Sequence, residues 1–301
     1  MKILLLFLDG VGIGAKDPTV NPFFVATLPV LRSLLNGKLP HKKLKQISTR
    51  HAELVPVNAT LGVSGLPQSG TGQTAIFTGV NGAKVIGRHF GPYPPTALRP
   101  IIEKQNILRR LKELGRSAVF ANAFPKQFFE YTDSGTRRLT VTTLSCLMSG
   151  IPLMNIEELR NDKAVSADLT RARWPEMGYP ELPIVTAEQA GMHLWEIAQE
   201  HDFTLFEYWL TDHAGHSQDM KKAVAVLEAF DQFLGGIMAE FDDRSLIVLI
   251  SDHGNIEDLS TKSHTRNQVP LLVIGKRRQE FARRVKNLTH ITPTILRFMQ
   301  E

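Results

Sequence analysis

The stretch ILLLFLD, residues 3–9, is an uninterrupted apolar run that ends at an acidic residue. Six consecutive apolar residues, without polar alternation, are typical of a strand that is buried on both faces of a sheet. The same arrangement returns at LIVLISDH, residues 246–253. Together the two stretches indicate a sheet that is covered on both faces, with polar side chains where its strands end.

Further apolar runs extend this pattern along the chain, and helical patterns separate them. Strands are expected at residues 3–8, 117–121, 204–210, 246–250 and 271–274. The clearest helices are expected at residues 106–114, 187–200 and 221–241. Alternating strands and helices predict an α/β fold with a mostly parallel sheet and helices on both of its faces. Such sheets place functional residues at the carboxyl ends of their strands.

One region does not follow this alternation. Between residues 125 and 185 the chain carries prolines, glycines and mixed charge, and its hydrophobic periodicity is weak. We interpret this region as a small cap, or an elaborated excursion from the sheet, within a single domain that covers residues 1–301. A length of 301 residues with 43% hydrophobic residues is sufficient for one large core.

The charge of the chain bears on its binding partner, and its cysteine content bears on disulfide bonds. The formal net charge is +5, but the basic residues are scattered over helical patterns, which favours a small anionic substrate over a nucleic acid as partner. The single cysteine, Cys146, excludes an internal disulfide and is typical of a small buried side chain. No apolar stretch reaches the roughly 20 residues of a membrane helix, and the first residues lack a signal-peptide cleavage site. We therefore expect a cytoplasmic protein without a membrane partner.

Acidic residues end two of the expected strands. Asp9 precedes the sequence GVGIG, where a turn would leave its carboxylate at the edge of the sheet. The alternative for Asp9 is a turn aspartate that caps the next segment. Asp252 and His253 follow a buried strand, where polar groups are costly unless they have partners. Carboxylates and imidazoles that converge at one sheet edge indicate a metal site.

Two further segments supply residues of the same types. Asp212 and His216 are four residues apart, which places both on one face of a helical turn after the strand that precedes them. The alternative for this pair is a capping aspartate and a surface histidine. His264 lies in the loop before the last expected strand.

A hydroxyl residue stands in the glycine-rich segment GLPQSGTG, residues 65–72. The apolar pattern that follows predicts a helix, and Ser69 would lie at its N-terminus, where backbone N–H groups favour a phosphate. A serine in that position is a weak nucleophile until its pKa is lowered. Ser69 could instead be a simple helix cap, and Thr71 is a rival for either role.

The order of these blocks resembles the alkaline phosphatase superfamily, and most closely the branch with cofactor-independent phosphoglycerate mutase and phosphopentomutase. The blocks are LDG, a hydroxyl residue before Gly72, D-x-x-G-H, D-H-G-N, H-T-x-N-x-V-P and the tail HITPTILRFM. The resemblance covers both ends of the chain. It implies a site with two divalent ions, and the mixture of carboxylate and imidazole ligands suits Mn²⁺ or Zn²⁺, with Mg²⁺ as a third candidate.

The resemblance also implies a role for each matching residue. In this family the hydroxyl at the position of Ser69 attacks phosphorus and becomes phosphorylated. The expected ligands of one ion are Asp9, Ser69, Asp252 and His253, and those of the other are Asp212, His216 and His264.

Departures from the family pattern bear on the reaction. Gln73 stands where the mutases carry a histidine, and their large inserted cap is absent, because residues 125–185 are enough for a small lid but not for the full cap domain. A mutase needs a lid that keeps water from its phosphoenzyme. We therefore expect a phosphatase or phosphodiesterase that hydrolyses a small phosphate ester through a phosphoserine, with a phosphomutase as the alternative. A non-catalytic, metal-bearing binding protein on the same fold is the second alternative.

The substrate contacts are expected among basic residues near the same segments. Lys84, Arg88 and His89 follow the helix of Ser69 and could line an anion pocket, with Arg88 able to bind phosphate through two hydrogen bonds. The alternative is a solvated basic loop. Arg266, next to the motif of His264, is a further candidate.

Overall fold

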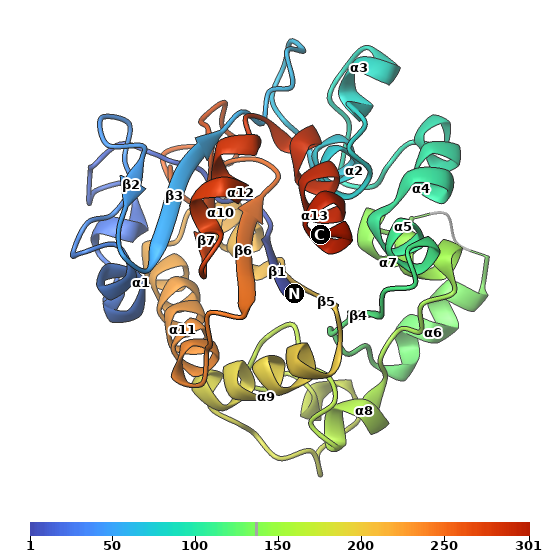
Figure 1. Ribbon diagram of the computed structural model, residues 1–301. Helices are drawn as coiled ribbons and strands as arrows, with labels where there is room; N and C mark the ends of the chain where they lie inside the picture. The colour runs from blue at the N-terminus through green and yellow to red at the C-terminus, as the bar shows by residue number, and fades with distance from the viewer. Residues whose placement is uncertain (136–137) are drawn as a thin grey trace.

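The computed structural model describes residues 1–135 and 138–301, and seven strands of these residues form one sheet (Figure 1). The order across the sheet is β2 (Ile47–Ser48), β3 (Ala52–Val57), β7 (Val269–Ile274), β6 (Ser245–Ser251), β1 (Lys2–Leu8), β5 (Phe203–Tyr208) and β4 (Ala118–Phe120). The pairs from β6 to β4 are parallel, whereas β7 is antiparallel to both β6 and β3. β3 therefore runs in the direction of the parallel strands, and the predicted mostly parallel sheet is confirmed.

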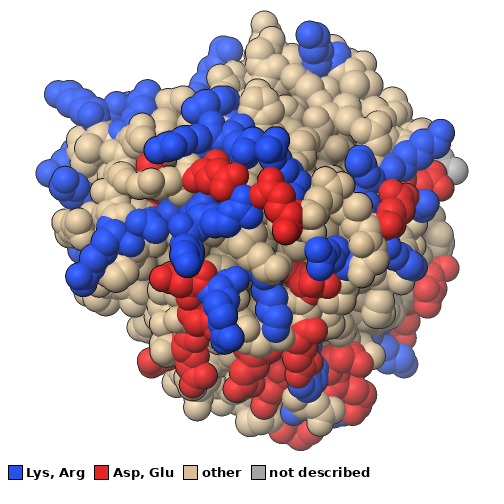
Figure 2. Space-filling view, in the orientation of Figure 1, with Lys and Arg blue, Asp and Glu red and all other residues tan. Residues whose placement is uncertain are grey.

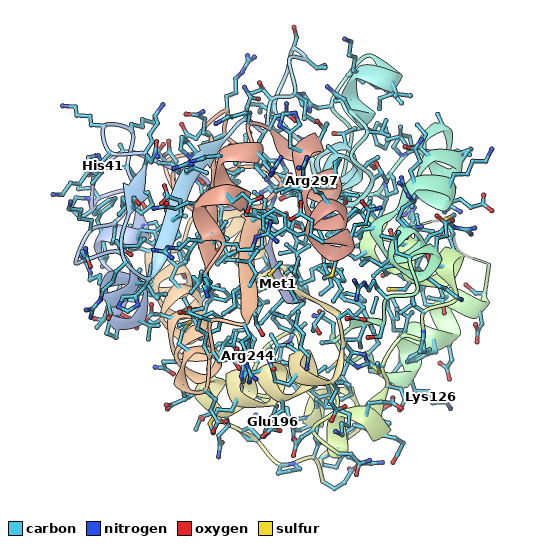
Figure 3. The ribbon with its side chains drawn as sticks, viewed as in Figure 1. Met1, His41, Lys126, Glu196, Arg244 and Arg297 are labelled. Atoms are coloured by element: carbon cyan, nitrogen blue, oxygen red, sulfur yellow. The ribbon has the colours of Figure 1, made fainter. Side chains whose placement is uncertain are left out.

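Helices cover both faces of this sheet, as predicted, because alternate residues of β1 face two different cores. Ile3 and Leu5 pack in the first core, and Leu4 and Leu6 pack in the second. The first core is covered by α2 (Ser69–Thr78), α3 (Gly82–Ile86), α4 (Arg99–Gln105), α5 (Ile107–Glu113), α7 (Val141–Ser149), α12 (Arg278–Arg284) and α13 (Ile291–Gln300). The second is covered by α1 (Pro29–Leu34), α9 (Ala187–Glu200), α10 (Leu210–Ser217) and α11 (Met220–Ala239). Side chains fill the space between these layers (Figure 3).

Several predicted boundaries change by a few residues. The strand expected to reach Leu210 ends at Tyr208, because α10 already begins at Leu210 and carries the chain away from the sheet. The helix expected to reach Phe241 ends at Ala239, whereas α9 has the predicted bounds. β2 and β3 were not predicted, because Glu53 and Pro56 interrupt the apolar pattern of AELVPV.

The region from 125 to 185 contains short helices. They are α6 (Lys126–Asp133), α7, α8 (Ile156–Arg160) and the 3-10 turn η3 (Pro175–Met177). α7 packs in the first core, and its Cys146 is fully buried, as predicted. The later part of the region forms a small apolar cluster of its own, which includes Leu159 and Trp174.

The remaining short turns are η1 (Pro22–Phe24), η2 (Thr96–Leu98) and η4 (Leu288–His290). Within the described residues, every helix is too short or too polar to cross a membrane. On the face shown in Figure 2, Lys and Arg gather at the upper left, where Figure 1 places β2 and β3, and Asp and Glu gather toward α8 and α9. The net charge of +5 is therefore not spread evenly over this face.

Candidate active site

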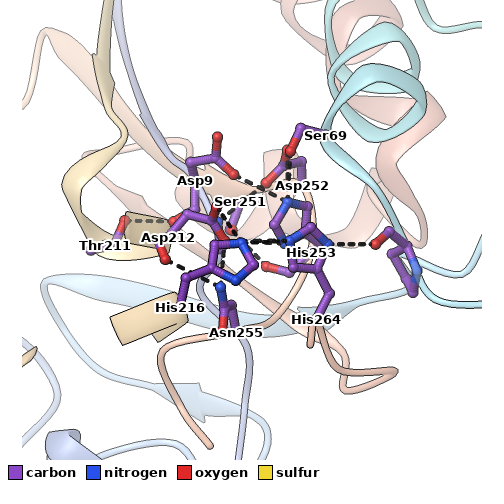
Figure 4. Close-up of polar contacts among 12 residues, drawn as sticks. Asp9, Ser69, Thr211, Asp212, His216, Ser251, Asp252, His253, Asn255 and His264 are labelled. Atoms are coloured by element: carbon purple, nitrogen blue, oxygen red, sulfur yellow. Dashed lines mark hydrogen bonds and ion pairs between the residues drawn. The ribbon is translucent and has the colours of Figure 1, made fainter. Parts of the chain in front are cut away.

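The seven side chains expected as metal ligands lie together at the carboxyl edge of the parallel strands (Figure 4). Asp9 follows β1, Asp212 lies in α10 after β5, and Asp252 follows β6. The sheet order β6-β1-β5 places these three strand ends side by side. His216, His253, His264 and Ser69 complete the group, which we call the acidic–histidine cluster.

Glycines allow the segments of this cluster to approach closely. Gly10 has a φ of +70°, and a Cβ atom on it would lie 2.5 Å from Asp212 Oδ1. Gly72 lies in α2, and a Cβ atom there would lie 3.0 Å from the Cβ and the carbonyl oxygen of Asp252. The turn after β1 can therefore contact α10, and α2 can contact the end of β6, only because these positions lack a side chain.

Three residues of the cluster surround the hydroxyl of Ser69. Its Oγ lies 3.0 Å from His253 Nε2, and the same nitrogen lies 3.1 Å from Asp9 Oδ1 and 3.6 Å from Asp252 Oδ2. Ser69 is the first residue of the ten-residue helix α2, so backbone N–H groups at the beginning of that helix lie next to the hydroxyl. The arrangement places a hydroxyl, two carboxylates and an imidazole around one point.

The second part of the cluster joins Asp212 to two histidines. His216 Nε2 lies 3.1 Å from Asp212 Oδ2, and His264 Nε2 lies 3.6 Å from Asp212 Oδ1. The two Nε2 atoms are 3.2 Å apart. Two imidazole ligands of one tetrahedral ion, each about 2.05 Å from it, would be separated by about 3.3 Å. The spacing of these nitrogens therefore fits a shared ion.

Backbone carbonyls orient both imidazoles. His216 Nδ1 lies 2.7 Å from the carbonyl oxygen of Lys262, and His264 Nδ1 lies 2.8 Å from that of Pro67. A carbonyl oxygen can only accept a hydrogen bond, so each Nδ1 carries the hydrogen. Each Nε2 of a neutral ring then presents a lone pair to the other, and two facing lone pairs suit a cation.

Within the part of the chain that the structure describes, buried polar atoms of the cluster lack hydrogen bonds, and Asp9 Oδ1 and Asp252 Oδ2 have only the ion-pair contacts with His253. Asp9 Oδ1, Asp252 Oδ2 and His253 Nδ1 are buried without a hydrogen bond among the described residues. A buried carboxylate oxygen without a hydrogen bond is costly. The combination of such carboxylate oxygens with imidazole nitrogens fits divalent ions such as Mn²⁺ and Zn²⁺.

The crowded charges of the cluster shift the pKa values of its carboxyl and imidazole groups. Burial and the neighbouring Asp252 raise the pKa of Asp9 to about 8, and burial also raises the pKa of Asp252. Burial lowers the pKa of His253, but the carboxylates of Asp252 and Asp9 outweigh it and raise that pKa to about 10. Burial and the charge of His253 lower the pKa of His264 to about 4. Protons are thus retained between Asp9 and His253, where a cation would compensate the same negative charge.

Two residues have a positioning role that the sequence did not predict. Asn255 Nδ2 donates to Asp212 Oδ1 over 2.7 Å. The buried Glu257 Oε2 accepts hydrogen bonds from the backbone N–H groups of Gly12, at 2.9 Å, and of Asn255, at 2.7 Å. Glu257 thereby joins the loop after β1 to the loop after β6. An acid two residues beyond the D-H-G-N block was the available signal.

The alternative hydroxyl has other partners. Thr71 Oγ1 donates to the carbonyl oxygen of Gln68 over 3.1 Å and accepts from the N–H of Phe90 over 3.3 Å. These contacts direct the Thr71 hydroxyl to backbone atoms outside the cluster. Gln73 is buried, and its Nε2 lies 3.5 Å from Asp9 Oδ2.

The four predicted substrate contacts separate into two groups. Lys84 and Arg88 are exposed, and within the described residues no hydrogen bond or ion pair joins them to the cluster; the Arg88 guanidinium instead lies 5.4 Å from the ring centre of Phe90. His89 is partly buried and lies 3.3 Å from the carbonyl oxygen of Val63 through Nε2. Burial is the main cause that lowers the pKa of His89, and the positive charge of Arg266 lowers it further. His89 and Arg266 are therefore near each other.

Comparisons with known proteins agree with this geometry. A family model described as the metalloenzyme superfamily matches residues 179–300. The 2,3-bisphosphoglycerate-independent phosphoglycerate mutase of Moorella thermoacetica is 28% identical over 125 residues, which cover 39% of this chain and 24% of the relative. The mutase of the same name from Desulforudis audaxviator is 33% identical over 105 residues, 33% of this chain and 21% of the relative. The matches thus span about a quarter of these relatives.

Solved structures share the fold over nearly the whole chain. The protein PH0037 of Pyrococcus horikoshii superposes with a TM-score of 0.58 at 14% identity, covering 99% of this chain and 97% of that one. The alkaline phosphatase of the Antarctic bacterium TAB5 superposes with a TM-score of 0.54 at 12% identity, with the same coverage. The resemblance stated from the sequence is confirmed: residues 179–300 match the model of the metalloenzyme superfamily, and the chain has the fold of the alkaline phosphatases.

Proposed function

We propose that this chain is a two-metal-dependent phosphatase or phosphodiesterase that hydrolyses a small phosphate ester through a phosphoserine at Ser69. The observation that carries the proposal is the position of the Ser69 hydroxyl. It lies at the first residue of α2, 3.0 Å from His253 Nε2, beside the buried carboxylates of Asp9 and Asp252. The N-terminus of a helix favours a phosphate at that place.

The residues divide between two ions by distance. His253 is 3.1 Å from Asp9 but 4.0 Å from Asp212, so we assign it to the ion of Asp9, although it lies within reach of both groups. When bound, the two ions would lower the pKa of the serine hydroxyl and neutralise charge on the phosphoryl group. The proposed ligands are Asp9, Ser69, Asp252 and His253 for one ion and Asp212, His216 and His264 for the other.

The proposed reaction has two displacements. In the first, Ser69 Oγ forms a bond to phosphorus while the bond from phosphorus to the ester oxygen breaks, and the alcohol leaves after taking up a proton. In the second, a water molecule attacks phosphorus and gives up a proton, the bond to Ser69 Oγ breaks and that oxygen regains a proton, and a monoester substrate leaves as inorganic phosphate or a diester substrate as a phosphate monoester. The fixed N–H groups of α2 are suited to hold the phosphoryl oxygens in both steps.

The small size of the excursion supports hydrolysis. Part of the region from 125 to 185 is α7, which belongs to the first core, so only short segments remain to cover the site. Water is then harder to exclude from a phosphoserine. A phosphomutase is the second candidate, supported by the names of the relatives that match about a third of this chain.

The proposal is tested with purified protein loaded with Mn²⁺, Zn²⁺ or Mg²⁺ and a panel of phosphate monoesters and diesters. We expect release of inorganic phosphate from a monoester or of a phosphate monoester from a diester, loss of activity with a chelator, and a loss of at least about 10³-fold in kcat for Ser69→Ala. Thr71→Ala is the matched control and should retain most activity. An isomerised ester without free phosphate would support the mutase, and metal binding without turnover of any ester would refute both enzymes.

A further inference from the structure

A cavity of about 430 Å³ opens beside the acidic–histidine cluster, and Asp9 lines both. Its other walls come from the sheet edge at Phe120 and Glu207 and from the excursion, which contributes Phe128 and Trp174. Its volume lies within the range of about 300 to 1,000 Å³ that is usual for small-molecule sites. The cavity is thus large enough for an organic group next to the site of phosphoryl transfer.

Aromatic rings form one wall of this cavity. Phe124 and Phe128 are stacked, with ring centres 4.2 Å apart and an angle of 20° between the planes. Trp174 is held by a hydrogen bond of 2.7 Å from its Nε1 to Ser166 Oγ. Trp209, just before α10, is 37% exposed although it lines the cavity. Flat apolar surfaces of this kind favour a flat aromatic ligand.

The floor of the cavity carries a carboxyl group with spare hydrogen-bonding capacity. Glu207 belongs to β5 and is 7% exposed. Thr142 Oγ1 donates to its Oε2 over 2.6 Å, and no hydrogen bond or ion pair of the described residues reaches its Oε1. Burial raises the pKa of Glu207 to about 7. A carboxyl oxygen without a partner can accept a hydrogen bond from a donor on the ligand.

The charges around the cavity do not suit a second anionic group on the substrate. Asp168 also lines it, and its carboxylate accepts the N–H groups of Arg171, at 3.0 Å, and Arg173, at 2.9 Å. The Arg173 guanidinium lies 5.9 Å from the ring centre of Trp209, and it forms no ion pair within the described residues. This cation is on an exposed residue, whereas the buried floor is acidic. A compact carboxylate-bearing ester would find no buried cation among the described residues of the floor, and above about pH 7 the charged Glu207 would repel it.

We infer that this cavity receives the organic group of the phosphate ester, and that it selects an aromatic group carrying an O–H or N–H donor, which Glu207 accepts. The inference rests on the proposed function, because it assigns the substrate class of the same site. Glu207 and Trp209 are then specificity-determining residues that take no part in the phosphoryl transfer.

The test compares phenyl phosphate, 4-hydroxyphenyl phosphate and phosphoglycerate with the metal-loaded protein. The two aryl esters differ only by one hydroxyl donor. We expect kcat/KM to be highest for 4-hydroxyphenyl phosphate, about tenfold above phenyl phosphate, which corresponds to one hydrogen bond. Glu207→Leu should abolish this ratio, Glu207→Gln should retain part of it, and Trp209→Ala should weaken both aryl esters relative to phosphoglycerate. Lys126→Ala, on the exposed outer side of α6 (Figure 3), is the control and should change nothing.

A binding measurement separates this inference from the proposed function. Ser69→Ala protein loaded with metal is titrated calorimetrically with the same three esters, so turnover is not required. Tighter binding of 4-hydroxyphenyl phosphate that is lost in the Ser69→Ala, Glu207→Leu double variant would support the cavity assignment even if no ester were hydrolysed. Equal affinities for the aryl esters, or preferential binding and turnover of phosphoglycerate, would overturn it while leaving the phosphatase proposal standing.

Discussion

The acidic–histidine cluster and the neighbouring cavity meet at Asp9 but are built in opposite ways. The cluster consists of polar groups at the ends of regular strands, and its Asp252 and His253 are fully buried. The cavity is lined by aromatic rings, such as Trp174 of the excursion and Trp209 before α10, with an unpartnered carboxyl oxygen at Glu207. The difference teaches that the proposed chemistry belongs to the strand ends, whereas the choice of substrate belongs to a cavity that the sheet edge and the excursion form together.

Kinetics with several esters can test this division between the cluster and the cavity. A substitution in the cluster should reduce turnover of every ester by a similar factor, because all esters share the phosphoryl group. A substitution in the cavity should change the ratio between esters. A cluster variant that spares one ester would break the comparison.

The largest effect is expected for Asp212→Asn. Asp212 faces His216 at 3.1 Å and His264 at 3.6 Å, so the loss of its charge removes the anionic ligand of one proposed ion. We expect metal affinity and kcat/KM to fall by more than about 100-fold for all esters, since even outer-shell changes cost 10- to 100-fold. Metal titration and kinetics with two unlike esters measure it. Asp219→Asn, an exposed cap of α11, should leave metal binding unchanged.

The second effect concerns the support of the cluster. In Glu257→Gln an amide NH₂ group would face donors, because Oε2 accepts from Gly12 and Asn255 and Oε1 accepts from Asn267. We expect a loss of about 1 to 3 kcal/mol in the free energy of unfolding and a 10- to 100-fold loss of metal affinity. Urea unfolding and metal titration measure the two. Glu228→Gln, whose partly exposed Oε1 accepts from Thr27, serves as control, and equal losses in both variants would contradict the role of Glu257.

The third effect lies in the cavity and depends on pH. Burial raises the pKa of Glu207 from 4.5 to about 7, so the folded state favours its neutral form. The free energy of unfolding of the wild type should therefore fall relative to that of Glu207→Gln as the pH rises from about 4.5 to about 7. The fall should be about 3 kcal/mol, and above about pH 7 the difference between the two proteins should remain constant. Urea unfolding of chelator-treated protein over this range measures it. A difference that is independent of pH would show that Glu207 is not desolvated.

The smallest effect tests how tightly the cluster side is packed. A methyl group at Gly72 would meet Asp252 at 3.0 Å, so Gly72→Ala should cost about 1 to 3 kcal/mol and weaken activity on all esters. Gly235→Ala, also within a helix, would meet only a side-chain carbon of Val30 at 3.2 Å. This control should be neutral or stabilising by up to about 1 kcal/mol, since alanine favours helix. Thermal unfolding of both variants would show whether the two sites differ as expected.

Much of the cluster could be predicted because continuous apolar runs must be buried on both faces. Residues 3–8 and 246–250 therefore placed Asp9 and Asp252 at one sheet edge before any coordinates were known. The direction of β7 could not be predicted, because the order of strands along the chain does not specify which neighbours pair antiparallel. β3 was not predicted, because Pro56 breaks its apolar pattern.

The cavity could not be predicted, because its wall comes from segments without a regular period. Trp174 and Phe128 meet the sheet through tertiary packing of irregular chain, which no short sequence window reports. Glu207 did leave a signal: an acid inside the apolar run FTLFEYWL is costly in a buried strand unless it has a function. Lys84 and Arg88, in contrast, were predicted as substrate contacts only because they come shortly after Ser69 in the sequence.

The central position of β1 has a consequence for biosynthesis. Ile3 pairs with Phe203 on one side and Leu246 on the other, so its nearest partner is 200 positions later in the chain. At about 5 to 20 residues per second, the ribosome needs roughly 10 to 40 s to deliver that partner. During this interval the apolar strand β1 has no native strand partner, although Phe77 of α2 can already pack on Phe7, and chaperones that shield nascent chains would act on its exposed edges.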